Sequence, residues 1–319
     1  MKKLFTALLI LCLALSLCSC GTKTETELVF STGGTGGTYY AYGTVIAQYV
    51  SDNTDVSVSV VPSNGSQSTL ESLSSGESQL GFVQNDVAYY AYNGTGIFEG
   101  QKGITDFAAV ASLYTETVQI VTCDFDIKNV SDLAGRIVSV GAEGSGVYYN
   151  ALDVLAAYDM TIEDIDPRYL DFDASAEALN NGEIDAAFIV AGEPTSAVAN
   201  LCSSKLCYLV ELDTDHISTL MGISPLYTEY YIPAGTYCRI DKDTHTVGVK
   251  ATIIARTDVP ADAIYDLVSA IFEGKEDITS AYAKGSALDL NFASVCGLPY
   301  HPGAAKFFSE KGYNVETGG

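Results

Sequence analysis

Two glycine-rich turns contain the residues whose chemistry is easiest to interpret in this 319-residue chain. The first, Ser31 to Tyr42, follows an apolar, strand-like run and leads into a segment with helical spacing, and a second turn, Gly141 to Gly146, has the same surroundings. A glycine-rich turn that opens a helix leaves the first backbone N–H groups of that helix free and partly positive. Both turns are therefore predicted to bind an anion or the negative end of a dipole through the backbone.

The two turns belong to a longer internal repeat. Gly37-Thr38-Tyr39-Tyr40 returns as Gly146-Val147-Tyr148-Tyr149, and the pattern L-x-x-G-E-x-x-x-x-F-[VI] begins at Leu73 and again at Leu179. Each copy of that pattern is typical of a helix that ends at a glycine and is followed by a buried strand. Two copies in the same order, about a hundred residues apart, predict an α/β protein with two lobes.

Polar side chains follow the predicted buried strands. Gln84, Asn85 and Asp86 come directly after the apolar run 80–83, where open α/β sheets place their ligand contacts. We expect Gln84 and Asn85 to face a cleft, while Asp86 also fits the N-cap of a following helix. In the second copy, the loop 192–195 takes the same position after the strand 186–190.

The repeat fixes the expected course of the chain between the lobes. Two crossings are expected, near 115–121 and 248–254, and two adjacent crossing strands would form a hinge that lets rigid lobes close on a ligand. The residues 114–117 are expected to separate two strands. The aromatic segment 230–237 is expected to be a loop, which either lines the cleft or packs on the surface of lobe two. The predicted limits are a signal peptide (1–20), a tether (21–27), lobe one (28–116 and 253–319) and lobe two (117–252).

The amino-terminal segment is typical of export. Two lysines precede an apolar run from Leu4 to Leu17, which is short for a bilayer span but suits a secretion signal. Its end resembles the bacterial lipobox, so Cys20 is the predicted lipidated residue, with Cys18 as the second choice and an ordinary signal peptide as the alternative. Acyl chains on Cys20 would hold the protein at the outer face of the membrane.

Cysteine usage agrees with an oxidising compartment. Cys202 and Cys207 could close a small loop through a disulfide, and a Cys123–Cys238 bond is a looser possibility. The spacing of the cysteines and of the three histidines is not typical of metal ligands, so no metal site is predicted.

Composition argues against nucleic acid as a partner and against catalysis. The formal net charge is −24, which would repel a phosphate backbone. The chain lacks the common nucleophile, zinc-protease and P-loop motifs, and its glycine-rich turns do not match the dinucleotide fingerprint. We therefore expect a binding protein without a cofactor rather than an enzyme.

Several motifs, in order along nearly the whole mature chain, resemble the TAXI-type solute receptors of TRAP transporters. They are Gly33 to Tyr40 (GGTGGTYY), Gly81 to Tyr89 (GFVQNDVAY), Ser139 to Gly146 (SVGAEGSG) and Ile232 to Tyr237 (IPAGTY). The resemblance implies an extracytoplasmic receptor with the type II periplasmic-binding-protein fold. Such a receptor would deliver a small solute, for example glutamate, glutamine or a small carboxylate, to an ion-coupled permease.

The resemblance also implies the two walls of the binding cleft. The lobe-one wall would consist of Thr35, Thr38, Tyr39, Gln84 and Asn85. The lobe-two wall would consist of Gly144, Ser145, Gly146 and the loop at Glu193, with Tyr231 as a further candidate. Glu193 would either meet an ammonium group of the solute or face away. The alternatives are a lipoprotein sensor or adhesin with the same fold and, less favoured, an exported hydrolase.

Overall fold

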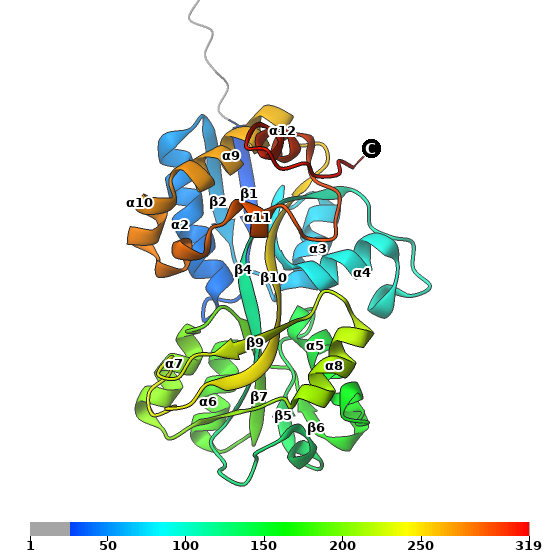
Figure 1. Cartoon of the computed structure of the whole chain (residues 1–319), viewed down its shortest axis with the longest axis vertical. Helices are drawn as coiled ribbons and strands as arrows, with labels where there is room; N and C mark the ends of the chain where they lie inside the picture. The colour runs from blue at the N-terminus through cyan, green and yellow to red at the C-terminus, as the bar shows by residue number, and fades with distance from the viewer. Residues whose placement is uncertain (1–25, 319) are drawn as a thin grey trace, which may run out of the picture.

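One sheet runs through both halves of the computed structural model, which describes residues 26–318. Its strands follow the order β2-β1-β3-β10-β4-β7-β5-β6, with β8 paired to β4 and β9 paired to β10. Figure 1 shows the two halves stacked along the long axis, joined by β4 and β10. The strands are β1 (Thr26–Ser31), β2 (Val56–Val61), β3 (Leu80–Gln84), β4 (Phe107–Thr122), β5 (Ile137–Ser139), β6 (Asp166–Arg168), β7 (Ala186–Ala191), β8 (Tyr208–Val210), β9 (Thr228–Ile232) and β10 (Thr244–Arg256).

Lobe one, as we use the name from here on, contains β1 to β3 and the helices of both ends of the described chain. Its strands β1, β2 and β3 are parallel, and their apolar side chains form one core with the helices that cover them. Tyr39 stacks on Phe82 in this core with ring centroids 4.8 Å apart. The helices are α2 (Thr38–Asn53), α3 (Ser66–Ser75), α4 (Asn85–Asn93), η1 (Gly96–Phe98), α9 (Ala261–Glu273), α10 (Lys275–Ala281), η4 (Ala283–Ala287), α11 (Leu290–Ala293) and α12 (Pro302–Glu310).

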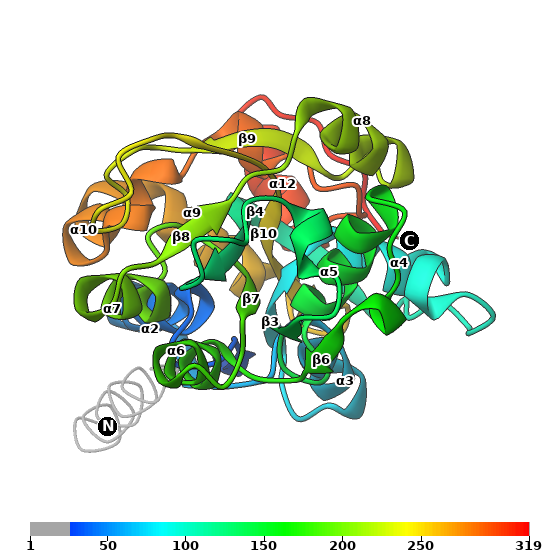
Figure 2. The same cartoon turned by 90° about the horizontal axis from the view of Figure 1, so that it is seen from below.

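Lobe two contains β5 to β9 and has an apolar cluster on each face of its sheet. Figure 2 shows α6 and α7 on one side of β7 and α5 and α8 on the other. Parallel pairing of β5 with β6 and β7 brings the amino-terminal ends of α5 and α6 to the same edge of the sheet. The helices are η2 (Val130–Leu133), α5 (Gly146–Ala157), η3 (Ile162–Asp164), α6 (Phe172–Asn181), α7 (Ser196–Ser204) and α8 (Thr214–Ile223).

The hinge consists of β4 and β10, which pair antiparallel from Phe107–Arg256 to Thr117–Gly248. The lobe-one core includes Tyr114 and Ala251, and the lobe-two core includes Val118 and Val249, so both strands change lobes within a few residues. The expected fold, two α/β lobes joined by a two-strand hinge, is confirmed.

Three local predictions were wrong. The residues 114–117 do not separate two strands, because β4 continues through them and pairs with β10 there. Thr26 and Glu27, expected in the tether, pair with Val56 and Ser57 of β2. The segment 230–237 is not entirely a loop, since its first part lies in β9 and pairs with β10.

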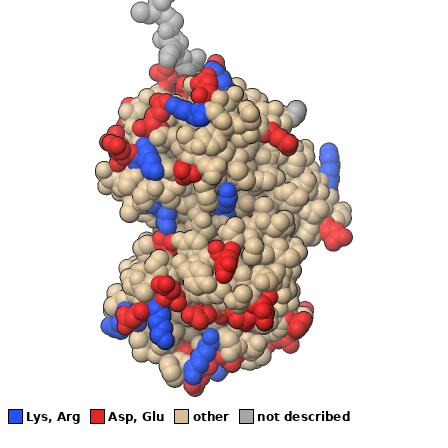
Figure 3. All heavy atoms as spheres, viewed as in Figure 1, with Lys and Arg blue, Asp and Glu red and all other residues tan. Residues whose placement is uncertain are grey.

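The surface of the molecule reflects its negative charge. On the face drawn in Figure 3, acidic side chains gather over lobe two, and the surface narrows where β4 and β10 cross between the lobes. Within the range 26–318, no helix is both long enough and apolar enough to cross a membrane.

Candidate functional site

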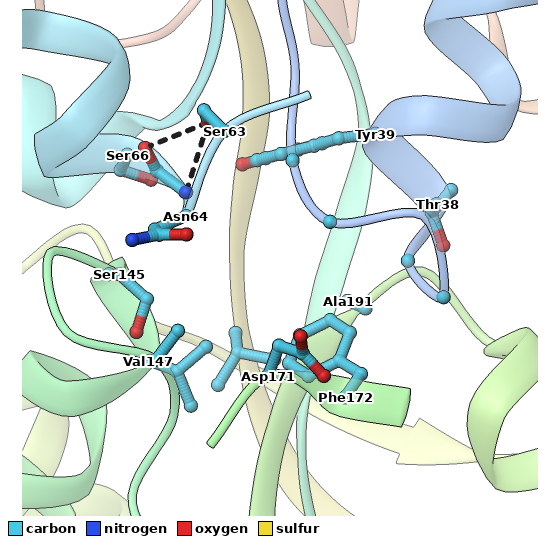
Figure 4. A pocket seen from close by; sticks show the side chains of 18 of the residues that line it. Thr38, Tyr39, Ser63, Asn64, Ser66, Ser145, Val147, Asp171, Phe172 and Ala191 are labelled. Atoms are coloured by element: carbon cyan, nitrogen blue, oxygen red, sulfur yellow. Dashed lines mark hydrogen bonds between the residues drawn. The ribbon is translucent and has the colours of Figure 1, made fainter. Parts of the chain in front are cut away.

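A cavity lies between the two lobes, where four helices begin. The volume within which the centre of a water molecule can move is about 90 Å³, which is room for several waters or a small solute. Figure 4 shows side chains from both lobes around it. The lining residues are Gly33 to Tyr39, Ser63 to Ser66, Gln84, Glu116, Ala142, Ser145 to Val147, Asp171 to Asp173, Val190 and Ala191.

Two of the four helix ends belong to lobe one. Helix α2 begins after Gly37 and helix α3 begins after Gly65, and neither N-cap residue can bond the first turn with a side chain. Ser63 holds the loop before α3, because its hydroxyl donates to the carbonyl of Thr32 (2.6 Å) and accepts from the Gly65 N–H (3.0 Å). The first turns of both helices therefore present backbone N–H groups to the cavity.

The other two helix ends belong to lobe two. Helix α5 begins after Ser145, whose side chain makes no capping bond. Helix α6 is capped, because the Asp171 carboxylate accepts from the Ala174 N–H at 2.8 Å. A Cβ atom added to Gly65 would lie 3.2 Å from the Cα atom of Ser145, so the ends of α3 and α5 meet across the lobe boundary. Three ends without a side-chain cap give this cavity a partly positive lining.

A buried carboxyl group also lines the cavity. Glu116 of β4 is only 2% exposed, and its Oε2 atom accepts a hydrogen bond from the Tyr39 hydroxyl at 2.6 Å. Burial raises the pKa of Glu116 to about 8, although the bonds from Tyr39 and Tyr114 and the charge of Lys284 act in the opposite direction. An uncompensated negative charge is costly here, so the group favours either a proton or a positively charged neighbour.

Gln84 is oriented by a chain of buried side-chain amides. Asn150 of α5 uses its Nδ2 atom to donate to the Asp86 carboxylate at 2.8 Å, so its Oδ1 atom is left to accept from Nε2 of Gln84 at 2.6 Å. Because an amide has only one oxygen, this arrangement directs the Gln84 Oε1 atom elsewhere. Asp86 is therefore part of an interlobe network and lies in the first turn of α4, and the N-cap position predicted as its alternative role is occupied by Gln84.

Two buried polar atoms of the cavity wall have no hydrogen-bond partner among residues 26–318. They are Oε1 of Gln84 and the Ser145 hydroxyl oxygen, and their residues are 2% and 3% exposed. An unpaired polar group in such a place costs free energy, on the order of 1–3 kcal/mol. A solute with matching donors and acceptors would remove that cost.

The lobes touch on several sides of the cavity. The Thr38 hydroxyl donates to the Gly192 carbonyl at 3.0 Å, and the Ser68 N–H donates to the Gly144 carbonyl at 3.1 Å. On another side, Lys284 Nζ donates to the Glu193 carbonyl at 2.6 Å. These contacts describe a closed arrangement of the two lobes.

Six of the ten residues expected at the cleft line this cavity. Thr35, Thr38, Tyr39, Gln84, Ser145 and Gly146 come from both predicted walls and meet here. Among them, Thr35 is exposed at the rim, where its hydroxyl lies 3.4 Å from the Asp173 carboxylate.

The structure does not bring the other four residues to the cavity. Asn85 is turned toward β10, where its Oδ1 accepts from the Lys250 N–H at 2.7 Å. Gly144 makes the interlobe contact with Ser68 instead. Glu193 lies beside Lys284, and its carboxylate accepts a hydrogen bond from the Tyr230 hydroxyl at 2.8 Å. Tyr231 is 52% exposed, because the alternation of side chains along β9 directs it outward, where it stacks on His245.

Several lining residues were not predicted from the sequence. The polar turn Ser63–Ser66 places Gly65 before a helix without a capping side chain, which is the same signal as in the two main turns. Glu116 lies in a crossing strand, and Asp171 to Asp173 begin α6. Only the meeting of the lobes turns these residues toward one space.

The cysteine prediction is confirmed for one pair. Cys202 and Cys207 form a disulfide, whereas Cys123 and Cys238 are free, so the looser pairing does not occur. The predicted lipidation site, Cys20, lies outside the described residues. Among residues 26–318 there is no group of three His, Cys, Asp or Glu side chains able to hold a metal ion.

Comparison with known proteins agrees with this architecture. The model of the NMT1-like family matches residues 30–312. One similar solved structure is a protein from Bordetella bronchiseptica RB50, with a TM-score of 0.54 and 16% identity over 90% of this chain and 89% of that one. Another is the glutamate-bound GluR0 ligand-binding core of Nostoc punctiforme, with a TM-score of 0.51 and 12% identity over 81% of this chain and 98% of that one. A third is the ligand-binding component of an ABC-type import system from Staphylococcus aureus, with zinc bound. Its TM-score is 0.50, with 12% identity over 92% of this chain and 94% of that one. The chain therefore belongs to the NMT1-like family and has the periplasmic-binding-protein fold.

Proposed function

We propose that this protein is an extracytoplasmic solute receptor that encloses a small polar solute between its two lobes. The observation that carries the proposal is the interlobe cavity, which combines three helix ends lacking a side-chain cap with two buried polar atoms that have no partner. Free backbone N–H groups at helix ends favour anionic groups, so a carboxylate is the expected anionic part of the solute.

Capture and closure can be tested without knowing the solute. The protein is purified from its native host under mild conditions, and native mass spectrometry identifies what co-purifies. The solute is then removed by unfolding and refolding, and small-angle scattering is recorded before and after it is returned. We expect a more compact envelope with the solute. A protein that carries nothing and keeps one envelope with every candidate metabolite would contradict the proposed function.

We further propose that the solute is an amino acid such as glutamate or glutamine, or a small carboxylate, and that the receptor serves a TRAP-type transporter. The resemblance of the motifs to TAXI receptors supports this finer assignment. The proposal includes a lipid anchor on Cys20, which would hold the receptor at the outer face of the membrane. Uptake through a TRAP transporter depends on an ion gradient. Deletion of the receptor should abolish uptake, and collapse of the gradient at constant ATP should do the same. Uptake that survives the collapse would contradict a TRAP partner and favour an ATP-driven one.

A further inference from the structure

The cavity has two chemically different parts, and the difference bears on which solutes it accepts. The helix ends of α2, α3 and α5 offer backbone donors. In contrast, Glu116 and Gln84 offer acceptors: a carboxyl group that is 2% exposed and an amide oxygen with no partner. Donors suit an anionic group, whereas these acceptors suit a group that carries N–H or O–H bonds.

The orientation of Gln84 is determined by its neighbours. Reversing the amide would place its oxygen against the Asn150 Oδ1 atom, 2.6 Å away at the present position of Nε2. Asn150 cannot reverse in turn, because its Nδ2 atom donates to the Asp86 carboxylate. The negative charge of Asp86 therefore fixes an acceptor, not a donor, at the free end of the Gln84 side chain, which lies beside the lining residue Gly146.

Glu116 is surrounded by groups that leave room for a positive charge. Tyr39 of α2 and Tyr114 of β4 donate hydroxyls to its two oxygens, at 2.6 and 3.4 Å, and Asp86 of α4 adds a second negative charge nearby. Lys284 of η4 is a basic group that acts on Glu116, but its amine donates to the Glu193 carbonyl and lies over the Tyr114 ring. No ion pair to Glu116 is formed by the described residues.

We propose that Glu116 and Gln84 select a solute that carries an ammonium group beside its carboxylate, so that the cavity accepts compact amino acids and rejects carboxylates of the same shape without the amine. Glu116 would pair with the ammonium group, Gln84 would accept one of its N–H bonds, and the helix ends would hold the carboxylate. This inference rests on the proposed function, of which it narrows the solute class.

Ionisation of Glu116 makes the inference measurable. Burial raises the pKa of Glu116 to about 8 in the closed arrangement without a solute, so at pH 7 most molecules in that arrangement hold a proton there. Binding of an ammonium group favours the carboxylate, so the proton leaves to the buffer. Affinity should therefore rise roughly fivefold between pH 7 and pH 8, as the ionised fraction of Glu116 grows. The pKa of Asp86, raised to about 6 by burial, lies below this range.

The test is calorimetry on matched pairs of solutes, L-glutamate against glutarate and L-alanine against propanoate, with wild type and Glu116→Gln. At least one amino acid should bind wild type more than tenfold better than its matched acid, with a binding enthalpy at pH 7 that depends on the ionisation enthalpy of the buffer. Glu116→Gln should lose roughly 10- to 100-fold in affinity for that amino acid and lose the buffer dependence. Glu77→Gln, the same change at an exposed site of lobe one, is the control.

A second variant and a second measurement separate binding from folding. In Tyr39→Phe, loss of the hydroxyl that donates to Glu116 should move the rise in affinity to higher pH. For the closed arrangement without a solute, a raised pKa of Glu116 means that the stability from this group is full below its normal pKa near 4.5 and falls as the pH rises toward 8. Glu116→Gln should therefore melt close to wild type at pH 5 and above it at pH 8.

The possible results separate this inference from the proposed function. Equal binding of the amino acids and their matched acids, no binding of either class, or a co-purified solute without an amine would overturn the inference. In each case, compaction with some other solute would leave the receptor function intact. If Glu116→Gln bound the amino acids as well as Glu77→Gln does, the assigned role of Glu116 would be wrong.

Discussion

The two walls of the cavity are built differently, although they come from related halves of the chain. The lobe-one wall contributes side chains held by buried partners: Tyr39 with Glu116, and Gln84 with Asn150. The lobe-two wall contributes the beginning of α5 and apolar side chains such as Val147 and Ala191. Charged groups of that wall, Asp171 and Asp173, are exposed at its edge. We therefore expect most side-chain contacts to the proposed solute to come from lobe one, whereas lobe two adds the α5 end with Ser145 and closes over the cavity.

Gly146→Ala is the change expected to damage closure most. A Cβ atom at this position would lie 1.5 Å from the Gln84 Oε1 atom and 3.1 Å from the Ser66 hydroxyl oxygen, so the closed arrangement would be blocked. The affinity for the solute should fall more than 100-fold, which corresponds to about 3 kcal/mol or more. An open, empty protein avoids the clash, so its melting temperature should change little. Calorimetry and scattering with the solute measure the two effects.

Gly222→Ala serves as the control for that variant. Gly222 is exposed in α8 and has no atom within 4 Å of an added Cβ, so the change should leave affinity unaltered and favour the helix slightly. If Gly146→Ala closed on the solute as wild type does, the close approach of lobe two would not be needed for binding.

The double variant Thr38→Ala with Ser145→Ala should have an intermediate effect and tests both walls together. It removes the hydroxyl that donates to the Gly192 carbonyl across the lobes and the buried hydroxyl oxygen without a partner. We expect at least tenfold weaker binding by calorimetry and a nearly unchanged melting temperature of the empty protein. Thr44→Ala with Ser203→Ala, at exposed positions, is the matched control. Early unfolding of the empty variant would instead make Thr38 and Ser145 structural residues.

Removal of the disulfide should affect binding least. Cys202 and Cys207 are buried in lobe two, and neither lines the cavity. Because the bond closes a short loop, Cys202→Ser with Cys207→Ser should lower the free energy of unfolding by about 2 kcal/mol, measured by denaturant titration. The affinity should stay within about twofold of wild type. A tenfold loss would show that recognition depends on the stability of lobe two as well as on lobe one.

The sequence alone determined the repeated α/β unit, the positions of the helix-opening turns and the two crossings of the chain. These features depend on local rules: glycine frees the backbone before a helix, and apolar runs of strand length form the sheet. Gln84 could be expected at the cleft from its place at a strand end, whereas the resemblance to TAXI receptors added Thr35, Thr38, Tyr39, Ser145 and Gly146. All six residues line the cavity.

Only the tertiary structure decided which side chains line the cavity. Asn85 and Gln84 are neighbours in the sequence, yet one bonds β10 and the other lines the cavity, because successive residues at the end of a strand point in different directions. The pattern of the sequence could not identify Glu116 either, since its position depends on where β4 passes between the lobes and on the hydroxyl of Tyr39, far away in the chain. Contacts between distant segments set burial and charge, and burial and charge determine what this cavity can bind.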